Sequence, residues 1–287
     1  MRSSMIEVLK AGFYDTIQDL GRFGMQNIGV PLSGAMDQYA AKTANSVLGN
    51  NVNDAVLEIT VSGPKLLFHC DTVISLSGAN LNALMNAEHV KLNSIIAVKK
   101  NDILSFGKLS FGCRAYLAVK GGLLTEYVMK SRSMCPNITS NLRLQKGDCI
   151  KIEAYRNAKM SSTASVKLNL HYFENNLFEV YEGPEFKMLS KQQQEALFSR
   201  KFSISKDSNR MGIRLKEPFP NQLKSIITSL VLPGTIQLTP SGELIILMRD
   251  CQVTGGYPRV LQVSENAINR LAQRISGSNI RFKRIFQ

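Results

Sequence analysis

Two stretches of the chain gather polar and charged residues among glycines, and the first lies near the N-terminus. Residues 12–50 open with carboxylates, an amide and a guanidinium, which are Asp15, Gln18, Asp19 and Arg22. A carboxylate can orient a water molecule, and a guanidinium can bind an anion. The interleaved glycines suit backbone that turns sharply or approaches another group closely. The alternative is an ordinary surface loop, in which Arg22 pairs with Asp15 or Asp19.

The second stretch, LPGTIQLTPSGELIILMRDCQVTGGYP, spans residues 232–258. Asp250 follows an apolar strand, where its carboxylate would emerge at the end of a sheet. Thr254, Gly255, Gly256 and Tyr257 come next. Paired glycines expose backbone N–H groups that can face an oxyanion or a phosphate. A plain tight turn is the alternative interpretation.

A third candidate lies in the turn of DSNRMGIRL, residues 207–215. Arg210 can act as a forked donor to a carboxylate or phosphate. The alternative is a salt bridge to Asp207 that merely fixes the turn.

The second half of the first stretch is predicted to form a helix. Ser33 is placed to cap a helix that begins near Ala35, Asp37 favours its N-terminus, and Gly49 supplies a left-handed end. Helical spacing is shown by Tyr39, Ala40, Thr43, Ala44, Val47 and Leu48. A buried helix of this kind would hold the polar loop on a rigid support.

The rest of the chain is predicted to be mainly β in two halves. Short β-branched segments bounded by Gly, Asn or Asp are typical of antiparallel strands. Residues 156–167 lack periodicity and form the predicted linker between domains 1–155 and 168–287. In the second half, Ser190 and Gln193 form a capping box. Ser264 caps a last helix that ends at Gly277, with Ile268, Leu271, Ala272 and Ile275 as its buried stripe.

Composition excludes several function classes. The 287 residues are 44% hydrophobic and 20% charged, which indicates a globular protein. No apolar run reaches the ~18–20 residues that span a bilayer, and the N-terminus does not resemble a signal peptide. The net charge of +13 is scattered along a chain without stacking motifs, which argues against nucleic-acid binding.

Metal and disulfide chemistry are not predicted either. The five cysteines form no Cys-x-x-Cys pair, and the three histidines show no ligand spacing. We therefore expect most of the cysteines to be small buried residues in a reducing cytoplasm, and we expect no metal site. A nucleophilic role for Cys251 is a minor alternative.

The run DTIQDLGRFGMQNIGVPLSGAMDQYAAKTANSVLGN closely resembles the opening signature of the allophanate hydrolase subunit 2 family, also called biotin-dependent carboxyltransferase-like. The resemblance resumes at LEITVSGPKLLF, CRAYLAVKGG, DSNRMGIRL, LPGTIQLTPSGELIILMRDCQVTGGYPRV and LAQRISGSNIRF. Members include the C-type subunit of bacterial ATP-dependent 5-oxoprolinase, the antagonist of the Kip kinase inhibitor, and the carboxyltransferase part of urea amidolyase. The resemblance implies two cyclophilin-like β-barrel domains.

The function that the resemblance favours is a C-type subunit of 5-oxoprolinase, which opens 5-oxo-L-proline to glutamate with ATP cleavage. Its implied partners are an A-type subunit of the LamB/YcsF kind, together with a B-type subunit that resembles the Kip inhibitor. The resemblance implies that ATP acts through the assembled complex, and this chain carries no Walker motif that would place the ATP site on it. In this interpretation the water is oriented by Asp15, Asp19 or Asp250, and anionic groups are bound by Arg22 or Arg210. The Gly255–Gly256 backbone faces the oxyanion. Further contacts to the substrate come from Gln18, Thr254 and Tyr257.

Two rival functions remain open. One is a carboxyl- or carbamoyl-processing subunit, which would need separate partners because the chain lacks a biotinyl Met-Lys-Met site. The other is a regulatory protein that sequesters a histidine-kinase inhibitor without catalysis.

Two departures from the family pattern bear on substrate choice. The segment KSRSMCPNITSNLRLQKGD, residues 130–148, keeps Ser-Arg-Ser but lacks the usual glycines, and Val253 replaces a threonine. Because small anionic ligands need close backbone approach and a few charged anchors, residues 15–22 and 250–257 are predicted to line one cleft.

Overall fold

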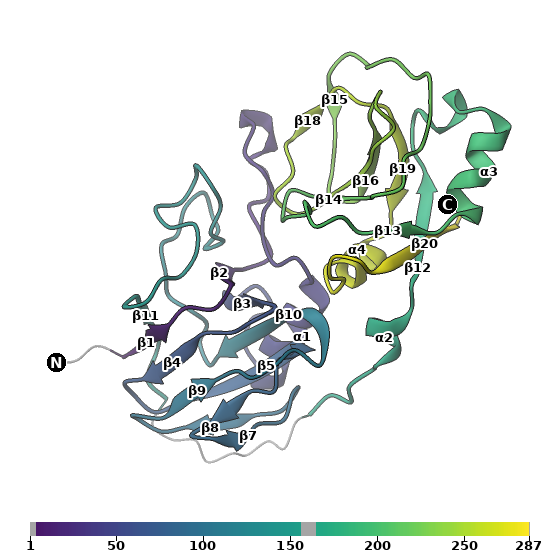
Figure 1. The fold of residues 1–287 in the computed structure, drawn as a ribbon. Coiled ribbons are helices and arrows are strands. Elements are labelled where there is room, and N and C mark those ends of the chain that lie inside the picture. The colour runs from purple at the N-terminus through teal and green to yellow at the C-terminus, as the bar shows by residue number, and fades with distance from the viewer. Residues whose placement is uncertain (1–3, 156–164, 287) are drawn as a thin grey trace. The chain divides into compact units, whose positions relative to one another are not determined.

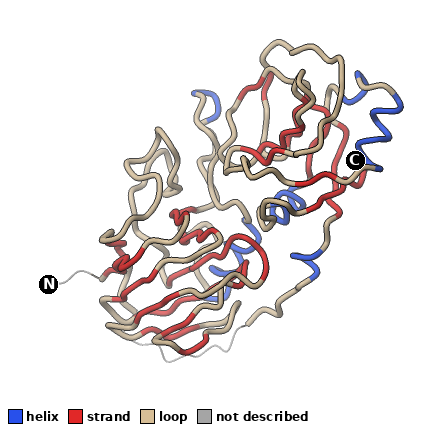
Figure 2. The backbone as a smooth tube through the Cα atoms, viewed as in Figure 1, coloured by secondary structure: helices blue, strands red, loops and turns tan. Residues whose placement is uncertain are grey.

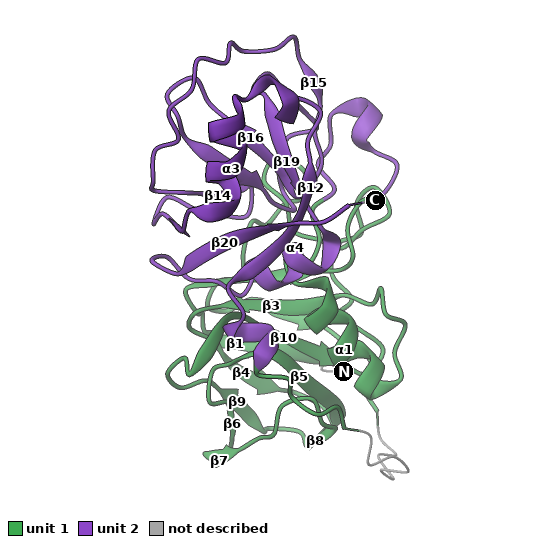
Figure 3. Ribbon diagram, turned by 90° about the vertical axis from the view of Figure 1, so that its right-hand side faces the viewer, with its two compact units in different colours: residues 1–22, 33–170 green, residues 23–32, 171–287 purple. Residues whose placement is uncertain are grey.

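The computed structural model describes residues 4–155 and 165–286. The chain forms two compact units, of which unit 1 comprises Met1–Arg22 and Ser33–Leu170, and unit 2 comprises Phe23–Leu32 and His171–Gln287 (Figures 1 and 3). Strand accounts for 33% of the described residues and helix for 14%, which confirms the mainly-β prediction (Figure 2). Most of the predicted linker, at residues 156–164, lies outside the described residues.

Unit 1 contains two antiparallel sheets. The six-stranded sheet has the order β11-β1-β4-β9-β6-β7, with bounds β1 Met5–Lys10, β4 Lys65–Phe68, β6 Leu84–Met85, β7 Glu88–His89, β9 Ile103–Ser105 and β11 Cys149–Lys151. The five-stranded sheet has the order β2-β3-β10-β5-β8, with bounds β2 Tyr14–Gln18, β3 Val56–Thr60, β5 Thr72–Asn80, β8 Ile96–Val98 and β10 Phe111–Val119. Apolar residues of both sheets share one core, including Ile6, Phe68, Ile17, Leu57 and Leu117.

Helix α1, Gln38–Leu48, packs on the five-stranded sheet through small side chains such as Ala40, Ala41 and Ala44. Its cap is Asp37, which accepts a hydrogen bond from the Ala40 backbone N–H at 3.0 Å, so the predicted cap at Ser33 is wrong. The reason is tertiary: an added Cβ on Gly34 would lie 2.8 Å from the Gly21 nitrogen. This close approach carries Ser33 to a φ of 58°, away from cap geometry. Gly49 ends the helix at φ 63°, as predicted.

A buried polar network fixes the start of α1 to the sheet. The Tyr116 hydroxyl accepts a hydrogen bond from the Asp37 backbone N–H at 2.8 Å and donates to Glu58 Oε2 at 2.9 Å. The Met36 N–H donates to the same Glu58 oxygen at 2.8 Å. Burial, and next the Glu58 charge, hold the pKa of Tyr116 well above its usual range, so the phenol stays a neutral donor.

Unit 2 is built on a seven-stranded sheet with the order β13-β20-β12-β19-β16-β17-β14, in which only the β12–β20 pair is parallel. The strand bounds are β12 Leu177–Glu182, β13 Phe202–Ser203, β14 Gly212–Arg214, β16 Thr235–Leu238, β17 Leu244–Leu247, β19 Arg259–Val263 and β20 Asn279–Arg284. Strands β15, Ser229–Leu230, and β18, Thr254–Gly255, form a separate pair.

The two edges of the seven-stranded sheet meet. Beyond β13 and β14, the Ser205 N–H donates to the Arg214 carbonyl at 2.8 Å, and the Lys216 N–H donates to the Ser203 carbonyl at 2.9 Å. Ile204 and Leu215 form an antiparallel bridge between them. The sheet therefore closes into a barrel, which removes its free edges.

The remaining helical elements are α2 His171–Glu174, α3 Lys191–Ser199, α4 Glu265–Leu271, and the 3-10 turns η1 Gln26–Ile28 and η2 Phe186–Met188. The capping box of Ser190 and Gln193 is confirmed, as is the Ser264 cap. Helix α4 ends earlier than predicted. After Leu271, backbone N–H groups donate to the carbonyl of the third preceding residue, which tightens the last turn. Ile275 is 45% exposed rather than buried. No described helix is long and apolar enough to cross a membrane.

Candidate functional site

The free edge of β2 is covered by residues 131–144. The Met134 N–H donates to the Ile17 carbonyl, and the Leu144 N–H donates to the Asp15 carbonyl, both at 2.8 Å. The Asp19 N–H donates to Ser133 Oγ at 3.0 Å. The segment that diverges from the family pattern therefore lies along the strand that carries the first group of predicted site residues.

Asp19 holds this segment in place. Its Oδ1 accepts hydrogen bonds from Ser131 Oγ and Ser133 Oγ, both at 2.7 Å, and from the Gly21 N–H at 2.8 Å. Its Oδ2 accepts from the Arg132 N–H at 2.7 Å. The carboxylate is 4% exposed, and four donors satisfy it. Asp19 is thus an anchor for Ser131–Arg132–Ser133 rather than a group that is free to orient water.

Asp15 has one free carboxyl oxygen. Its Oδ2 accepts a hydrogen bond from the Gly12 N–H at 2.5 Å, while its buried Oδ1 has no partner. Burial raises the pKa of Asp15 from 3.8 to about 6, against a smaller lowering by the Gly12 hydrogen bond. A carboxyl group with a pKa near neutral can both accept and donate a proton. Of the three predicted catalytic aspartates, Asp15 has the properties of a general acid–base.

Replacing Asp15 by asparagine is expected to stabilise unit 1 at neutral pH. Because the folded-state pKa is raised, stability falls as pH rises from about 4 to about 6, and the full cost is present above that range. A shift from 3.8 to about 6 corresponds to about 3 kcal/mol. The Asp15→Asn variant should therefore gain ~1–3 kcal/mol at pH 8 and lose its pH dependence between 4 and 6. Urea denaturation at pH 5 and pH 8 measures both, and equal stability of the two proteins at pH 8 would contradict the burial cost.

Arg22 and Gln18 are completely buried. Gln18 Nε2 donates to Thr16 Oγ1 and to the Met134 carbonyl, both at 3.1 Å, whereas its Oε1 has no partner. Arg22 Nη2 donates to the Ser133 carbonyl, and its Nε and Nη1 are without partners. Across residues 4–155 and 165–286, Arg22 forms no ion pair, so it does not pair with Asp15 or Asp19. The surface-loop alternative does not describe these buried side chains.

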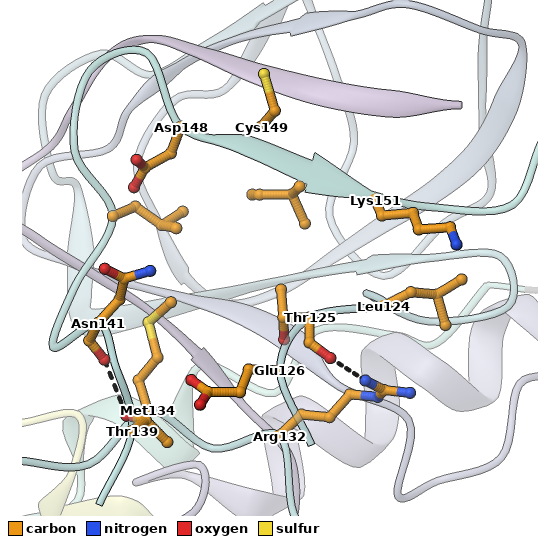
Figure 4. A pocket seen from close by; sticks show the side chains of 12 residues that line it. Leu124, Thr125, Glu126, Arg132, Met134, Thr139, Asn141, Asp148, Cys149 and Lys151 are labelled. Atoms are coloured by element: carbon orange, nitrogen blue, oxygen red, sulfur yellow. Dashed lines mark hydrogen bonds between the residues drawn. The ribbon is translucent and has the colours of Figure 1, made fainter. Parts of the chain in front are cut away.

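A cavity of about 250 Å³ opens beside residues 131–144 (Figure 4). It is lined by Leu124, Thr125, Glu126, Arg132, Met134, Thr139, Asn141, Leu144, Asp148, Cys149, Ile150 and Lys151. Arg132 donates through Nη1 to the Thr125 carbonyl and stacks over the Tyr127 ring at 5.2 Å. Glu126 accepts from the Ser140 N–H and Oγ at 3.0 and 3.1 Å. Sequence reasoning missed this cavity, and its only signal was the retained Ser-Arg-Ser run.

In unit 2, Arg210 and Asp250 bind each other. Arg210 Nε lies 2.7 Å from Asp250 Oδ2, and Arg210 Nη2 lies 3.0 Å from Oδ1. Both side chains are buried, at 7% and 5% exposed. The partner of Arg210 is thus Asp250, not the neighbouring Asp207 of the turn interpretation. The pair is bidentate, and it engages both carboxylate oxygens of Asp250 together with Nε and Nη2 of Arg210.

The first half of the Thr254–Tyr257 run, Thr254–Gly255, is strand β18 rather than a tight turn. Gly255 pairs with Ser229 in the β15–β18 ladder, and the Gly256 carbonyl accepts from the Ile226 N–H at 2.9 Å. A Cβ on Gly255 would lie 2.4 Å from Gln237 Nε2, so close packing accounts for this glycine. Tyr257 is 40% exposed and Thr254 is also exposed. Burial, with Asp250 second, raises the pKa of Cys251 to about 12, so its thiol is not a nucleophile at neutral pH.

The structure thus distributes the predicted site residues over the two units. Asp15, Gln18, Asp19 and Arg22 lie together in unit 1, and Arg210, Asp250 and residues 254–257 lie in unit 2. Their convergence on one cleft stays a prediction. In the described ranges no group of three or more His, Cys, Asp or Glu side chains could hold a metal ion, and all five cysteines are free thiols.

Comparison with known proteins places this geometry in context. Residues 28–284 match the family described as carboxyltransferase domain, subdomain A and B. The chain is 31% identical to the C-type subunit of 5-oxoprolinase from Escherichia coli K12, over 97% of this chain and 90% of that protein. It is also 31% identical to urea amidolyase of Lachancea kluyveri, over 96% of this chain but 17% of that protein. The solved Kluyveromyces lactis urea carboxylase superposes with a TM-score of 0.86 at 31% identity, covering 98% of this chain and 27% of that one.

Proposed function

We propose that this chain, which belongs to the carboxyltransferase domain family with subdomains A and B, is a C-type subunit of an ATP-dependent 5-oxoprolinase. The observation that carries the proposal is the match to the C-type subunit of Escherichia coli 5-oxoprolinase, because it covers most of both proteins. The urea amidolyase and urea carboxylase matches involve a small part of much longer proteins. Those matches favour a carboxyltransferase-type subunit of a urea-processing enzyme as the second candidate.

The proposed reaction explains why ATP is needed. An unstrained lactam is a poor electrophile, and phosphorylation of its oxygen activates the carbonyl carbon. One water adds to that carbon and the C–N bond breaks, with a proton passing to the nitrogen and an acyl phosphate remaining. A second water then releases phosphate and leaves glutamate. Each step requires a proton to move, and transition-state charge must be stabilised.

The side chains of unit 1 suit the proton-transfer part of this chemistry. Asp15, with its free Oδ1 and a pKa of about 6, can accept the proton of a water molecule and return it to the ring nitrogen. Asp19 keeps Ser131, Arg132 and Ser133 in one arrangement beside β2. The Arg210–Asp250 pair contributes structure to unit 2 rather than a free catalytic group.

The purified chain is expected to release no glutamate from 5-oxoproline and ATP by itself. The chain carries no nucleotide-binding Gly-x-x-x-x-Gly-Lys-Ser/Thr motif, and its relative is named as one subunit of several. Activity should appear when an A-type subunit of the LamB/YcsF kind is added together with a B-type subunit that resembles the Kip inhibitor. ATP-dependent glutamate release is measured for the chain alone, for each pair and for the full mixture.

Two results would count against the proposal. Glutamate release by the chain alone would refute the need for partners. A full mixture that is inactive on 5-oxoproline, with activity on urea-derived substrates in the presence of a biotinyl partner, would favour the carboxyltransferase alternative.

A further inference from the structure

Arg22 and Ser33 are the two residues at which the chain leaves and rejoins unit 1 around Phe23–Leu32, and we call this pair the neck. Two contacts bring the chain segments of the neck together. The Ala35 N–H donates to the Asp19 carbonyl at 2.8 Å. Gly34 lies so close to Gly21 that an added Cβ would come within 2.8 Å of the Gly21 nitrogen. The segments therefore run past each other in opposite directions, and Ser33 comes to the Arg22 end.

Both neck side chains are buried with hydrogen-bond donors that have no partner. Arg22 and Ser33 are each 0% exposed. Arg22 Nε and Nη1 and Ser33 Oγ find no acceptor in the described part of the chain. Ser33 also holds a φ of 58°, a backbone conformation that is uncommon for serine and that gathers at ligand-binding sites.

A buried guanidinium without a counter-charge is costly. Charged groups inside proteins are paired or bind an ion, because the loss of hydration otherwise goes uncompensated. The nearby carboxylate of Asp19 is already satisfied by four donors, and no carboxylate lies within ion-pair distance of Arg22 among the described residues. Arg22 therefore keeps hydrogen-bond donors that an anion from outside the chain would satisfy.

We propose that the neck is an oxyanion subsite, in which Arg22 and Ser33 bind the carboxylate or phosphate group of a small ligand. The guanidinium supplies charge-assisted hydrogen bonds, and the Ser33 hydroxyl supplies a neutral one. Gln18 Oε1, on the adjoining β2, is a buried acceptor without a partner. Gln18 Nε2 donates to the Met134 carbonyl and Arg22 Nη2 to the adjacent Ser133 carbonyl, so the two side chains reach neighbouring points of the chain. An acceptor close to the Arg22 donors matches a ligand that carries an N–H group as well as an oxyanion.

This pattern names a ligand if the proposed function is right. 5-Oxoproline has a carboxylate for Arg22 and Ser33 and a lactam N–H for Gln18. Inorganic phosphate offers only the oxyanion. The subsite itself does not depend on turnover, because it predicts that the isolated chain binds the anion.

Ligand binding to the full chain tests the subsite without partners or ATP. Isothermal titration and thermal melting are carried out with 5-oxoproline, inorganic phosphate, cyclopentanecarboxylate and 2-pyrrolidinone. 5-Oxoproline is expected to bind most tightly, and cyclopentanecarboxylate more weakly because it lacks the N–H group. 2-Pyrrolidinone, which lacks the carboxylate, is expected not to bind. Binding of phosphate alone would support an oxyanion subsite for the phosphoryl product, whereas equal binding of 2-pyrrolidinone, or no binding of any anion, would overturn it.

Variants separate an anion site from a structural brace. Arg22→Met should weaken 5-oxoproline or phosphate binding by about 10–100-fold, and Ser33→Ala by about 3–10-fold. The matched control is Arg143→Met, which removes the same charge from an exposed position of unit 1 and should leave affinity unchanged. Without ligand, Arg22→Met should melt at or above the temperature of the native protein. The proposal would be overturned by a large fall in that temperature, by failure to fold, or by unchanged affinity in both neck variants. Inactivity of the assembled enzyme with intact anion binding would count against the proposed function only.

Discussion

Replacing Asp250 by alanine is expected to lower the free energy of unfolding of unit 2 by about 3–5 kcal/mol. The change removes the carboxylate that the buried Arg210 guanidinium binds, so the part of the desolvation cost that this ion pair offsets is no longer compensated. Two hydrogen bonds, at 2.7 and 3.0 Å, are lost together. Urea denaturation of the full chain, followed by circular dichroism, measures the loss.

A matched ion pair on the surface of the same barrel provides the control. Arg214 Nη1 lies 2.6 Å from Glu243 Oε2, with side chains 44% and 33% exposed. Glu243→Ala should cost at most about 1 kcal/mol, because water screens an exposed pair. The double variant Arg210→Met with Asp250→Leu should be more stable than Asp250→Ala alone, since it removes both charges of this buried pair. If Asp250→Ala costs no more than Glu243→Ala, Asp250 is not committed to Arg210 and its assignment to water activation regains support.

The local elements of the fold could largely be predicted from the sequence, because their signals lie within a few residues. The capping box of Ser190 and Gln193 and the Ser264 cap depend on side chains three residues apart, and both form. The start of α1 was misjudged because Ser33 and Asp37 are both good caps. The choice was made by the close approach of Gly34 to Gly21, a tertiary contact that composition does not reveal.

The candidate site could be predicted only in part, because its partners are distant in the sequence. Sequence spacing suggested Asp207 for Arg210, whereas the bound carboxylate is Asp250, forty residues away. Three of the four donors to Asp19 come from Ser131, Arg132 and Ser133, more than a hundred residues further on. A residue type indicates which chemistry a side chain can do. Contacts between distant segments decide whether that side chain is already bonded to other groups of the protein.

Arg22 differs from Arg210, because it forms no ion pair in the described part of the chain. Its type suggested an anion-binding role, and a salt bridge to Asp15 or Asp19 was an equally good interpretation of the sequence. The structure separates the two, because Asp19 is saturated by neutral donors and Asp15 has a raised pKa and faces the Gly12 N–H. A small set of buried polar atoms at this end of unit 1 has no hydrogen-bond partner: Asp15 Oδ1, Gln18 Oε1, Arg22 Nε and Nη1, and Ser33 Oγ.

The position of residues 131–133 is expected to depend on Asp19 more than on any other side chain. In Asp19→Ala, four donors lose their acceptor at once: two serine hydroxyls and the backbone N–H groups of Gly21 and Arg132. Because the site is 4% exposed, water does not fully replace the carboxylate. Each buried donor left unsatisfied costs about 1–3 kcal/mol, so the variant should lose at least about 3 kcal/mol of stability.

The measurement must show where the protein loosens as well as by how much. Hydrogen exchange should become faster at residues 131–134, and the assembled enzyme should lose activity, because Arg132 and Met134 line the cavity and Ser133 contacts Arg22. Asp54→Ala is the matched control: Asp54 Oδ2 accepts one exposed backbone N–H, from Asn51 at 3.1 Å, and its loss should cost about 1 kcal/mol or less. Ser131→Ala and Ser133→Ala should each produce part of the Asp19→Ala effect. If Asp19→Ala costs no more than Asp54→Ala and exchange at residues 131–134 is unchanged, the segment is held by its backbone pairing with β2 alone, and the Asp19 carboxylate is available for chemistry after all.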